Sequence, residues 1–316
     1  MNKKVKGFLT ILTTMVIVVM VTLIILINVK FGKDKPVFTK TDASERQWTL
    51  TPNIESAMIQ TNYWNYVKAA YVLIGEAPDY EYYKIASGVP RNDYEVDNFF
   101  IDDSDNLMYY HDGEANKISH VAVDVSSYQR DINWEAVKAA GVDMAIIRVG
   151  YRGYGTGSIV TDDCFESHIE NALEAGLDVG VYFFTQALNY DEGVEEATYT
   201  LNLIKDYDIK GPVIIDTEIM PVDDARTKDL DVDSRTDSIV GFCETVKAAG
   251  YEPMVYSNRN WFVQELDMSR VGNYKLWLAH YSNQPDFPYL YTAWQYTSEG
   301  RLDGNDLDLD LNVWIE

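Results

Sequence analysis

The stretch KGPVIIDTEIM, residues 210–220, ends an apolar run on two carboxylates, Asp216 and Glu218, which are separated by one residue. Successive side chains of a strand point to opposite faces, so both acids should face one side, about 6.6–6.8 Å apart along the chain. Neighbouring carboxylates raise one another's pKa, so one of them can stay protonated near neutral pH. The spacing therefore suits a pair in which one group donates a proton while the other stays charged.

Two further acids are predicted to reach the same place. Asp124 lies at the end of the apolar segment HVAVDV, and Asp310 lies in DLDLN near the carboxyl terminus. In a closed barrel the first and last strands are neighbours, and the carboxyl ends of the strands share one mouth. Cleavage of a glycosidic bond needs such a cluster, because an acid must protonate the leaving oxygen while negative charge stabilises an oxocarbenium-like centre. For each acid taken singly, a helix N-cap or a solvated loop tip is the alternative.

Eight β-rich segments alternate with helical patterns after His120 and would position these acids. The predicted strands are 120–125, 143–150, 178–184, 212–218, 252–257, 274–280, 292–296 and 308–312. The predicted helices are 134–140, 163–175, 191–206, 234–249 and 258–266. Several strands are almost continuously apolar, as in a parallel sheet that is buried on both faces. The pattern predicts an α/β protein with a TIM-like β/α barrel, irregular because its last strands leave little room for helices.

Aromatic side chains lie at or near the ends of the predicted strands. Such rings can stack on sugars, and the alternative is that they fill the barrel core. Gln295, which is adjacent to Trp294, is predicted to make a polar contact with the substrate. The candidate substrate-binding residues are Tyr151, Tyr182, Tyr256, Trp277, Tyr281, Trp294 and Gln295.

No pattern in the chain predicts a metal or an organic cofactor. The acidic stretches 229–234 and 303–312 resemble calcium loops but lack the required glycine and glutamate positions. Ser126 lacks the flanking glycines of an esterase nucleophile. Cys164 and Cys243 are expected to be buried thiols, and a single bridge between them is left open.

The charge of the chain limits its partners. The 316 residues carry a formal net charge of −24. Nucleic acid binding needs basic patches, so nucleic acid is not expected as a partner. The same charge argues against docking on an anionic lipid surface, and an acidic surface usually serves solubility.

The amino-terminal segment predicts attachment to a membrane. Residues 8–29 carry no charge across 22 positions, and a helix of that length spans roughly 33 Å, enough for a bilayer core. A cleaved signal peptide is the alternative, but no small-residue cleavage site follows the run. We expect a cytoplasmic tip, a single transmembrane helix and an extracytoplasmic remainder.

The predicted order of domains follows from these segments. It is a tip and anchor at 1–30, a linker at 31–44, a small acidic α+β extension of unknown role at 45–118, and the barrel at 119–316. Within the extension, apolar spacing predicts a helix over 52–75, which Gly75 would end. The segments NFFID and LMYYH flank DSDN and predict a hairpin.

Six ordered blocks of the barrel region resemble glycoside hydrolase family 25, lysozymes that cut peptidoglycan between N-acetylmuramic acid and N-acetylglucosamine. The blocks are VAVDVSSYQRDINWEAVKAAGVDMAIIRVGYRG, AGLDVGVYFFTQA, VIIDTE, YSNRNW, LWLAHY and WQYTSEGRLDGNDLDLDLN. The resemblance covers residues 119–316 and implies a flattened, irregular β/α barrel. It implies Glu218 as the general acid and Asp216 as the group that orients the substrate's acetamido group or stabilises charge on it. Asp124 and Asp310 would complete the carboxylate cluster.

The chain departs from the family's pattern in its loops. Arg130 stands where the family usually has glycine, and Asn133 stands where it often has aspartate. Residues 304–307 read GNDL, where the family prefers GIxG. These positions are not the four acids, so the departures bear on substrate fit more than on catalysis.

Together these patterns lead to the hypothesis of a membrane-anchored, extracytoplasmic muramidase of a Gram-positive bacterium, acting on peptidoglycan strands without a cofactor. A chitinase-type hydrolase is one alternative, although Gly211 and Ile214 stand where the DxxDxDxE motif of that class has acids. A non-catalytic glycan-binding or scaffold module of the cell envelope, with unknown assembly partners, is the other.

Overall fold

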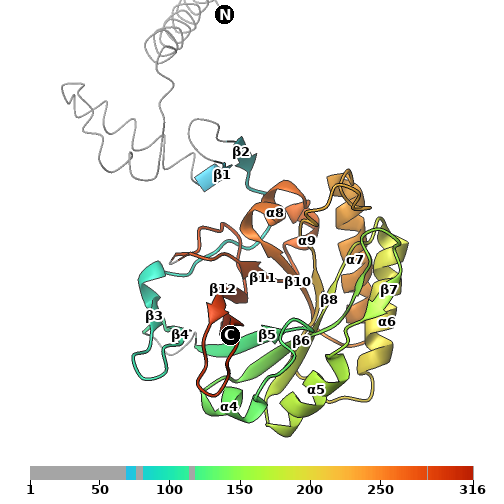
Figure 1. The fold of residues 1–316 in the computed structure, drawn as a ribbon. Coiled ribbons are helices and arrows are strands. Elements are labelled where there is room, and N and C mark those ends of the chain that lie inside the picture. The colour runs from blue at the N-terminus through green and yellow to red at the C-terminus, as the bar shows by residue number, and fades with distance from the viewer. Residues whose placement is uncertain (1–68, 76–80, 114–117, 283, 316) are drawn as a thin grey trace, which may run out of the picture. The chain divides into compact units, whose positions relative to one another are not determined.

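The chain forms two compact units, of which the second runs from Ile85 to the carboxyl terminus and contains the predicted barrel (Figure 1). The computed structural model describes residues 69–75, 81–113, 118–282 and 284–315. The predicted membrane anchor at 8–29 and the predicted linker at 31–44 lie outside the described residues. Within these described ranges, no helix is both long and apolar enough to cross a bilayer.

The described part of the first unit is a two-stranded antiparallel sheet of β1 (Tyr71–Ile74) and β2 (Glu81–Lys84). The prediction that a helix continues to Gly75 is therefore wrong over β1. Val72 and Ile74 are buried on one face, while Tyr71 and Leu73 on the other face are half-buried. Aromatic and β-branched side chains suit a strand with this alternation, and pairing with β2 outweighs the weaker helical spacing.

The second unit is built on a closed barrel of eight strands. They pair in the order β5–β6–β8–β9–β10–β11–β12–β13, and β13 pairs with β5 to close the ring. The strands are β5 (Ser119–Val125), β6 (Met144–Arg152), β8 (Asp178–Phe184), β9 (Val213–Asp216), β10 (Pro253–Asn258), β11 (Lys275–Ala279), β12 (Ala293–Gly300) and β13 (Leu309–Ile315). All eight predicted strands are thereby confirmed. A further short strand, β7 (Ile159–Thr161), pairs with the end of β6 and was not predicted.

The direction of β13 corrects the prediction of a parallel, TIM-like barrel. β13 runs antiparallel to both β12 and β5, whereas the other neighbouring strands of the ring are parallel. The short connection 301–308 explains this, because a hairpin loop joins antiparallel strands while parallel strands need a long crossover. The barrel is therefore a mixed one. Asp310 lies near the amino end of β13, and the antiparallel direction brings that end to the carboxyl end of β5.

Helices follow the strands on the side of the barrel that runs from β5 to β10 (Figure 1). They are α4 (Trp134–Ala139), α5 (Phe165–Glu174), α6 (Tyr190–Ile204), α7 (Val232–Ala248), α8 (Arg259–Gln264) and α9 (Met268–Val271). All five predicted helices are present. Asp231, from one of the calcium-like stretches, accepts a hydrogen bond from the Ser234 amide and caps α7. Between β11 and β13 the described residues form no helix, which confirms the predicted irregularity.

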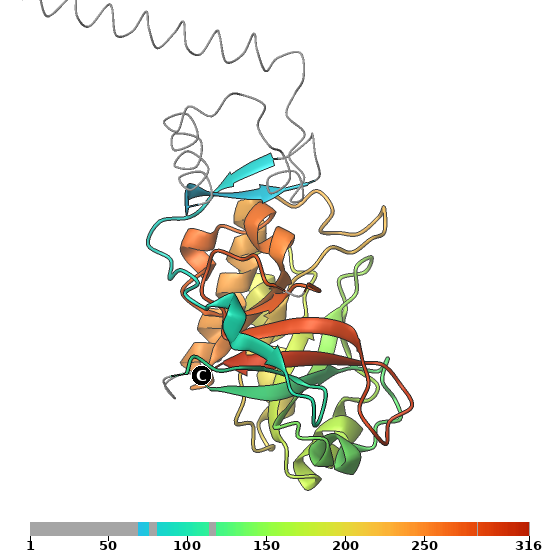
Figure 2. The ribbon, with the colours of Figure 1, turned by 90° about the vertical axis from the view of Figure 1, so that its left-hand side faces the viewer.

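The helix-free side of the barrel is covered by residues 85–113 (Figure 2). This segment holds η1 (Val96–Asn98) and a hairpin of β3 (Phe99–Ile101) and β4 (Met108–Tyr110), which confirms the predicted hairpin. The Phe99 ring packs edge-on against Trp294, with centroids 5.1 Å apart. The Tyr110 amide donates to Ser119 Oγ at 2.7 Å. Aromatic packing here replaces the missing helices, and the predicted boundary at residue 119 falls inside this compact unit.

The interior of the barrel is apolar in its middle and acidic at its mouth, where the carboxyl ends of β5 and β9 lie. One cluster of buried residues fills it: Ala122, Ile146, Tyr182, Ile214, Met254, Tyr256, Trp277, Ala279, Ala293 and Trp314. Two residues beyond Ala122 on β5, and beyond Ile214 on β9, the same strand faces carry Asp124 and Asp216. The carboxylates thus rest on a dry apolar layer that excludes water from beneath them.

Close packing of α6 on α7 gives a test of the fold. A Cβ at Gly193 would lie 1.9 Å from the Ser238 carbonyl oxygen, so Gly193→Ala forces the helices apart. We expect it to lower the free energy of unfolding by about 2 kcal/mol or more, although alanine is the better helix former. Gly155→Ala is the matched control, because nothing lies within 4 Å of its added Cβ. Denaturant unfolding of both variants measures the difference, and equal stabilities would contradict this packing.

Candidate active site

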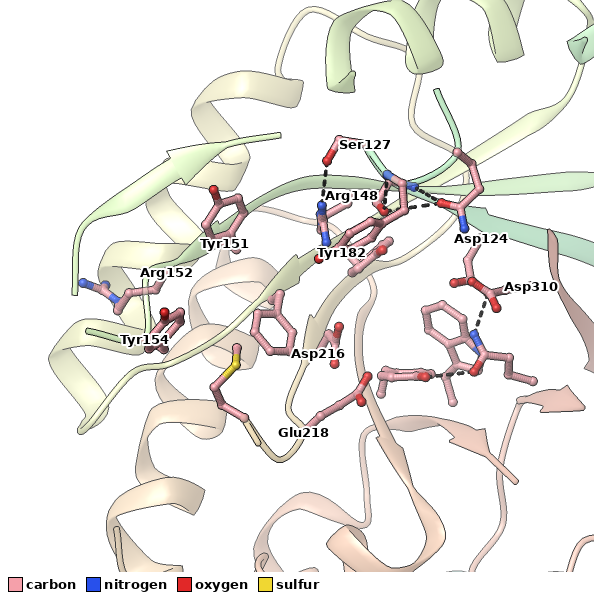
Figure 3. A pocket seen from close by; sticks show the side chains of 18 of the residues that line it. Asp124, Ser127, Arg148, Tyr151, Arg152, Tyr154, Tyr182, Asp216, Glu218 and Asp310 are labelled. Carbon is pink, nitrogen blue, oxygen red and sulfur yellow. Dashed lines mark hydrogen bonds between the residues drawn. The ribbon is translucent and has the colours of Figure 1, made fainter. Parts of the chain in front are cut away.

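Four carboxylates converge on the mouth of the barrel. Asp124 and Asp310 are directly opposite each other in the antiparallel pair of β5 and β13. Asp216 is the last residue of β9, and Glu218 follows in the loop beyond the strand, which is shorter than predicted. All four line one cavity of about 590 Å³ (Figure 3). The structure therefore brings together the acids that the sequence singled out.

The predicted aromatic residues divide between the cavity and the core. Tyr151, Tyr182, Tyr256, Trp277 and Tyr281 all line the cavity. Tyr182, Tyr256 and Trp277 are buried in its wall, whereas Tyr281 is 59% exposed. An exposed ring beside a cavity suits stacking on a sugar, while the buried rings shape the space.

Trp294 is placed differently from its prediction as a substrate contact. It is fully buried, and the described residues that line the cavity do not include it. Its neighbours Ala293 and Gln295 take the inward face of β12, so Trp294 faces outward. There its indole donates to the His280 carbonyl at 2.8 Å and its ring packs on Phe99. The side-chain alternation of β12 thus gives Trp294 a packing role.

Burial raises the pKa of all four carboxyl groups, and repulsion from neighbouring carboxylates adds to it for Asp124, Asp216 and Asp310. Burial, and then the charge of Glu218, hold the pKa of Asp216 well above its usual range. Burial and then Asp310 do the same to the pKa of Asp124, and burial raises the pKa of Asp310 to about 7. Burial also raises the pKa of Glu218, while hydrogen-bond contacts with Asp216 and Tyr256 act to lower it. The cluster therefore retains protons near neutral pH, as a general acid must.

Two amide side chains hold Asp124 in place. Its Oδ2 accepts hydrogen bonds from Gln295 Nε2 at 2.8 Å and from Asn312 Nδ2 at 2.9 Å. The Asn312 side chain is itself fixed, because its Oδ1 accepts from the Trp277 indole at 2.7 Å. Asn312 is fully buried in β13 and was missed by the sequence reasoning. Its signal was a polar amide inside the apolar run LNVWI.

The sequence predicted that Gln295 contacts the substrate, but in the structure its amide bonds to other protein side chains. Its Oε1 accepts from the Tyr256 hydroxyl at 2.8 Å and from the Tyr281 hydroxyl at 2.9 Å, while its Nε2 binds Asp124. The side chain is only 2% exposed. Both ends of the amide are occupied by protein groups, so Gln295 joins two tyrosines to the carboxylate cluster.

Arg148 supplies positive charge beside the acids and was also missed by the sequence reasoning. Its Nε donates to Asp162 Oδ2 at 2.7 Å, and a second guanidinium nitrogen donates to Ser127 Oγ at 3.0 Å. The guanidinium lies 5.3 Å and 5.6 Å from the ring centroids of Tyr128 and Tyr151. A charged residue inside the apolar strand AIIRVG was the available signal. Anchored in this way, Arg148 keeps a cation at a fixed place on the cavity wall.

The acidic and cysteine-containing segments form neither a metal site nor a disulfide among the described residues. In the described parts of the chain, no group of three or more His, Cys, Asp or Glu side chains could hold a metal ion. Cys164 and Cys243 are free and buried, which settles the bridge that the sequence left open. Burial raises the pKa of the Cys243 thiol far above its usual value.

Comparison with known families defines the class of the protein. Residues 123–305, more than half of the chain, match the sequence profile of glycosyl hydrolases family 25. The chain therefore belongs to family 25 of the glycoside hydrolases. The four acids that the resemblance implied all line the cavity.

Individual relatives are distant. The chain is 25% identical to the autolytic lysozyme of Clostridium acetobutylicum over 195 residues, which are 61% of this chain and 55% of that protein. It is 27% identical to lysozyme M1 of Streptomyces globisporus over 210 residues, 63% and 69% of the two chains. The chain thus spans about half the length of the first of these relatives.

Solved structures share the fold. The modular autolysin LytC of Streptococcus pneumoniae, in complex with a synthetic peptidoglycan ligand, superposes with a TM-score of 0.56 at 24% identity. That match covers 78% of this chain and 56% of the autolysin. A family 25 glycosyl hydrolase of Bacillus anthracis has a TM-score of 0.52 at 23% identity, covering 65% and 92% of the two chains.

The raised pKa of Asp310 predicts a dependence of stability on pH. Unfolded aspartate titrates near 3.9, whereas folded Asp310 titrates at about 7. The folded state therefore keeps a proton that the unfolded state has lost, and stability falls as pH rises from about 4 to 7. Asp310→Asn avoids this cost, so we expect its free energy of unfolding at pH 8 to exceed that of the parent by about 1–3 kcal/mol.

At pH 4 the same variant should differ from the parent by only about 0.5 kcal/mol, because folded Asp310 is protonated and about half of the unfolded chains also keep that proton. Asp303→Asn removes an exposed acid from the preceding loop and is the matched control. Denaturant unfolding at the two pH values decides the matter. An Asp310→Asn effect that is equal at pH 4 and pH 8 would show that the carboxyl titrates normally.

Proposed function

We propose that this chain is a membrane-anchored peptidoglycan hydrolase that cleaves the β-1,4 bond between N-acetylmuramic acid and N-acetylglucosamine. The observation that carries the proposal is the cluster of four raised-pKa carboxylates in one cavity of a family 25 fold. The names of the curated relatives, an autolytic lysozyme and lysozyme M1, support the same substrate class.

Glu218 is the proposed general acid. It is half-buried and lies past the end of β9, so its carboxyl can approach a bound glycan. Burial raises its pKa, and a protonated carboxyl can transfer a proton to the glycosidic oxygen as the bond to C1 breaks. Once ionised, the same group can accept a proton from the water that completes hydrolysis.

Asp216 is the proposed partner of the substrate's acetamido group. It hydrogen-bonds Glu218, so these two carboxyls are too close to flank an attacking water, which needs a separation of about 6.5–9.5 Å. Its Oδ1 is buried, and no donor among the described residues reaches it. A substrate N–H would satisfy that oxygen. The oxygen of the acetamido group could then form a bond to C1 as the glycosidic oxygen leaves. This bond closes a ring between the acetamido group and C1, and water later opens that ring to complete hydrolysis.

The first test is hydrolysis of purified Gram-positive cell wall by the full chain. We expect Glu218→Gln to lower the rate roughly 10²–10⁴-fold, because glutamine cannot donate the required proton. Glu299→Gln, an exposed acid on β12, should retain the parent rate. Mass spectrometry of the released fragments should show muramic acid at the new reducing ends. Other reducing ends, or wall binding without release, would favour the chitinase-type or non-catalytic alternatives.

The position of the enzyme is a separate part of the proposal. The uncharged run at 8–29 is long enough to span a bilayer. We propose that it anchors the chain with the family 25 domain on the outer face, where peptidoglycan lies. Such an anchor would confine hydrolysis to wall near the membrane.

Cysteine labelling tests this orientation, because both native cysteines are buried. In intact protoplasts, a membrane-impermeant maleimide should label Ser44→Cys and should not label Lys3→Cys. Lysis of the protoplasts should make Lys3→Cys reactive. Equal labelling of the two variants before lysis, or recovery of the chain in a salt-washed soluble fraction, would contradict the anchor.

A further inference from the structure

We propose that Gln295 is a positioning residue that ties the proton on Glu218 to the charge on Asp124 through the hydroxyl of Tyr256. The inference rests on the proposed function, since it explains how the general acid keeps its proton beside three other carboxyls. It is carried by a chain of hydrogen bonds whose donors and acceptors admit few arrangements.

The direction of the chain is set at the Trp277 indole. An indole N–H only donates, so Asn312 must present its Oδ1 to Trp277 and its Nδ2 elsewhere. The same Nδ2 also lies 3.2 Å from the Ala122 carbonyl, which only accepts. Asn312 therefore always donates to Asp124 Oδ2. This leaves the Gln295 amide as the movable link between Asp124 and the tyrosines.

Gln295 has two possible orientations, and the charge of Asp124 selects between them. When Asp124 is ionised, its Oδ2 accepts from Gln295 Nε2, and Gln295 Oε1 must accept from both tyrosine hydroxyls. When Asp124 is protonated, it can donate to Gln295 Oε1, and the amide nitrogen then donates to the tyrosine oxygens. Either arrangement satisfies every polar atom of the amide.

The hydroxyl of Tyr256 transmits this choice to Glu218. Tyr256 touches both Gln295 and the Glu218 carboxyl, and it has a single proton to donate. If that proton goes to Gln295, Glu218 completes the contact only by donating its own. An ionised Asp124 thus favours a protonated Glu218, and a protonated Asp124 favours an ionised one. The network disfavours the state in which both are ionised, because the contact between Tyr256 and Glu218 then has no proton to share.

Other charged and titratable groups also face these two carboxyls. They come from separate strands or loops of the barrel and are Asp216, Asp310, Tyr182, Tyr281 and Arg148. Replacing glutamine by leucine adds no charge, so the field of these groups is retained. The substitution removes the hydrogen-bond link and leaves the acids in place.

The test is the pH dependence of wall hydrolysis by the full-length Gln295→Leu variant. Asp124 loses a donor, so its pKa should rise and the acidic limb of the profile should move to higher pH. Tyr256 becomes free to donate to ionised Glu218, so the pKa of Glu218 should fall and the basic limb should move to lower pH. We expect each limb to move by about one pH unit, narrowing the active range from both sides.

Gln186→Leu is the matched control, because Gln186 is equally buried but bonds Thr227 and the Thr185 carbonyl. It should lose stability without narrowing the profile. Tyr256→Phe should make the position of the basic limb insensitive to Gln295→Leu, a non-additivity that a packing defect would not produce. The proposal would be overturned if neither limb of the pH profile moved in Gln295→Leu, or if the Gln186→Leu control narrowed the profile equally.

A direct titration separates this proposal from the proposed function. Carbon-13 NMR of labelled glutamate carboxyls follows the ionisation of Glu218 without any substrate, with Glu218→Gln assigning the signal. A midpoint that falls in Gln295→Leu supports the link even if the parent hydrolyses no wall. An unchanged midpoint in a folded, wall-hydrolysing parent and variant would sink the link and leave the enzyme assignment intact.

Discussion

The contact on which the site depends is the pairing of Asp124 with Asp310 across β5 and β13. Like charges directly opposite in an antiparallel pair destabilise a sheet, and here both lie above a dry apolar layer. Burial and then the charge of Glu218 raise the pKa of Asp310 to about 7, and the charge of Asp310 adds to burial in raising the pKa of Asp124. The barrel is thus less stable than it would be without this cluster, which holds protons at the cavity where the proposed glycan substrate would bind.

Rigid surroundings make that cluster usable. Hydrogen bonds from Gln295 and Asn312 fix one oxygen of Asp124, and Trp277 fixes Asn312 in turn. On the neighbouring strand β6, Arg148 is held by Asp162. These partners come from different strands of a closed ring, so no single element can shift alone. Catalytic groups held in this way need little reorganisation during reaction.

Much of the barrel could be predicted because its signals are local. Apolar strands, capped helices and acids at strand ends are each contained within a few residues, and all eight strands and five helices were found. The predictions that were wrong concern how strands pair and which face of a strand a side chain takes. Tyr71–Ile74 form a strand because β2 lies beside them, and Trp294 faces outward because the pleat of β12 turns Gln295 inward. Neither the pairing with β2 nor the orientation of β12 can be inferred from the residues on either side of these segments.

The sequence alone singled out the four acids of the cavity, since Asp124, Asp216, Glu218 and Asp310 stand out by type and by their place at apolar runs. Tertiary structure alone decided how they meet. Asp310 reaches Asp124 only because β13 runs antiparallel to β5. Asn312 and Gln295 gain their roles only when three strands come together around one carboxylate. Hydrogen-bond direction and charge repulsion depend on distances through space, and residue order along a chain does not contain those distances.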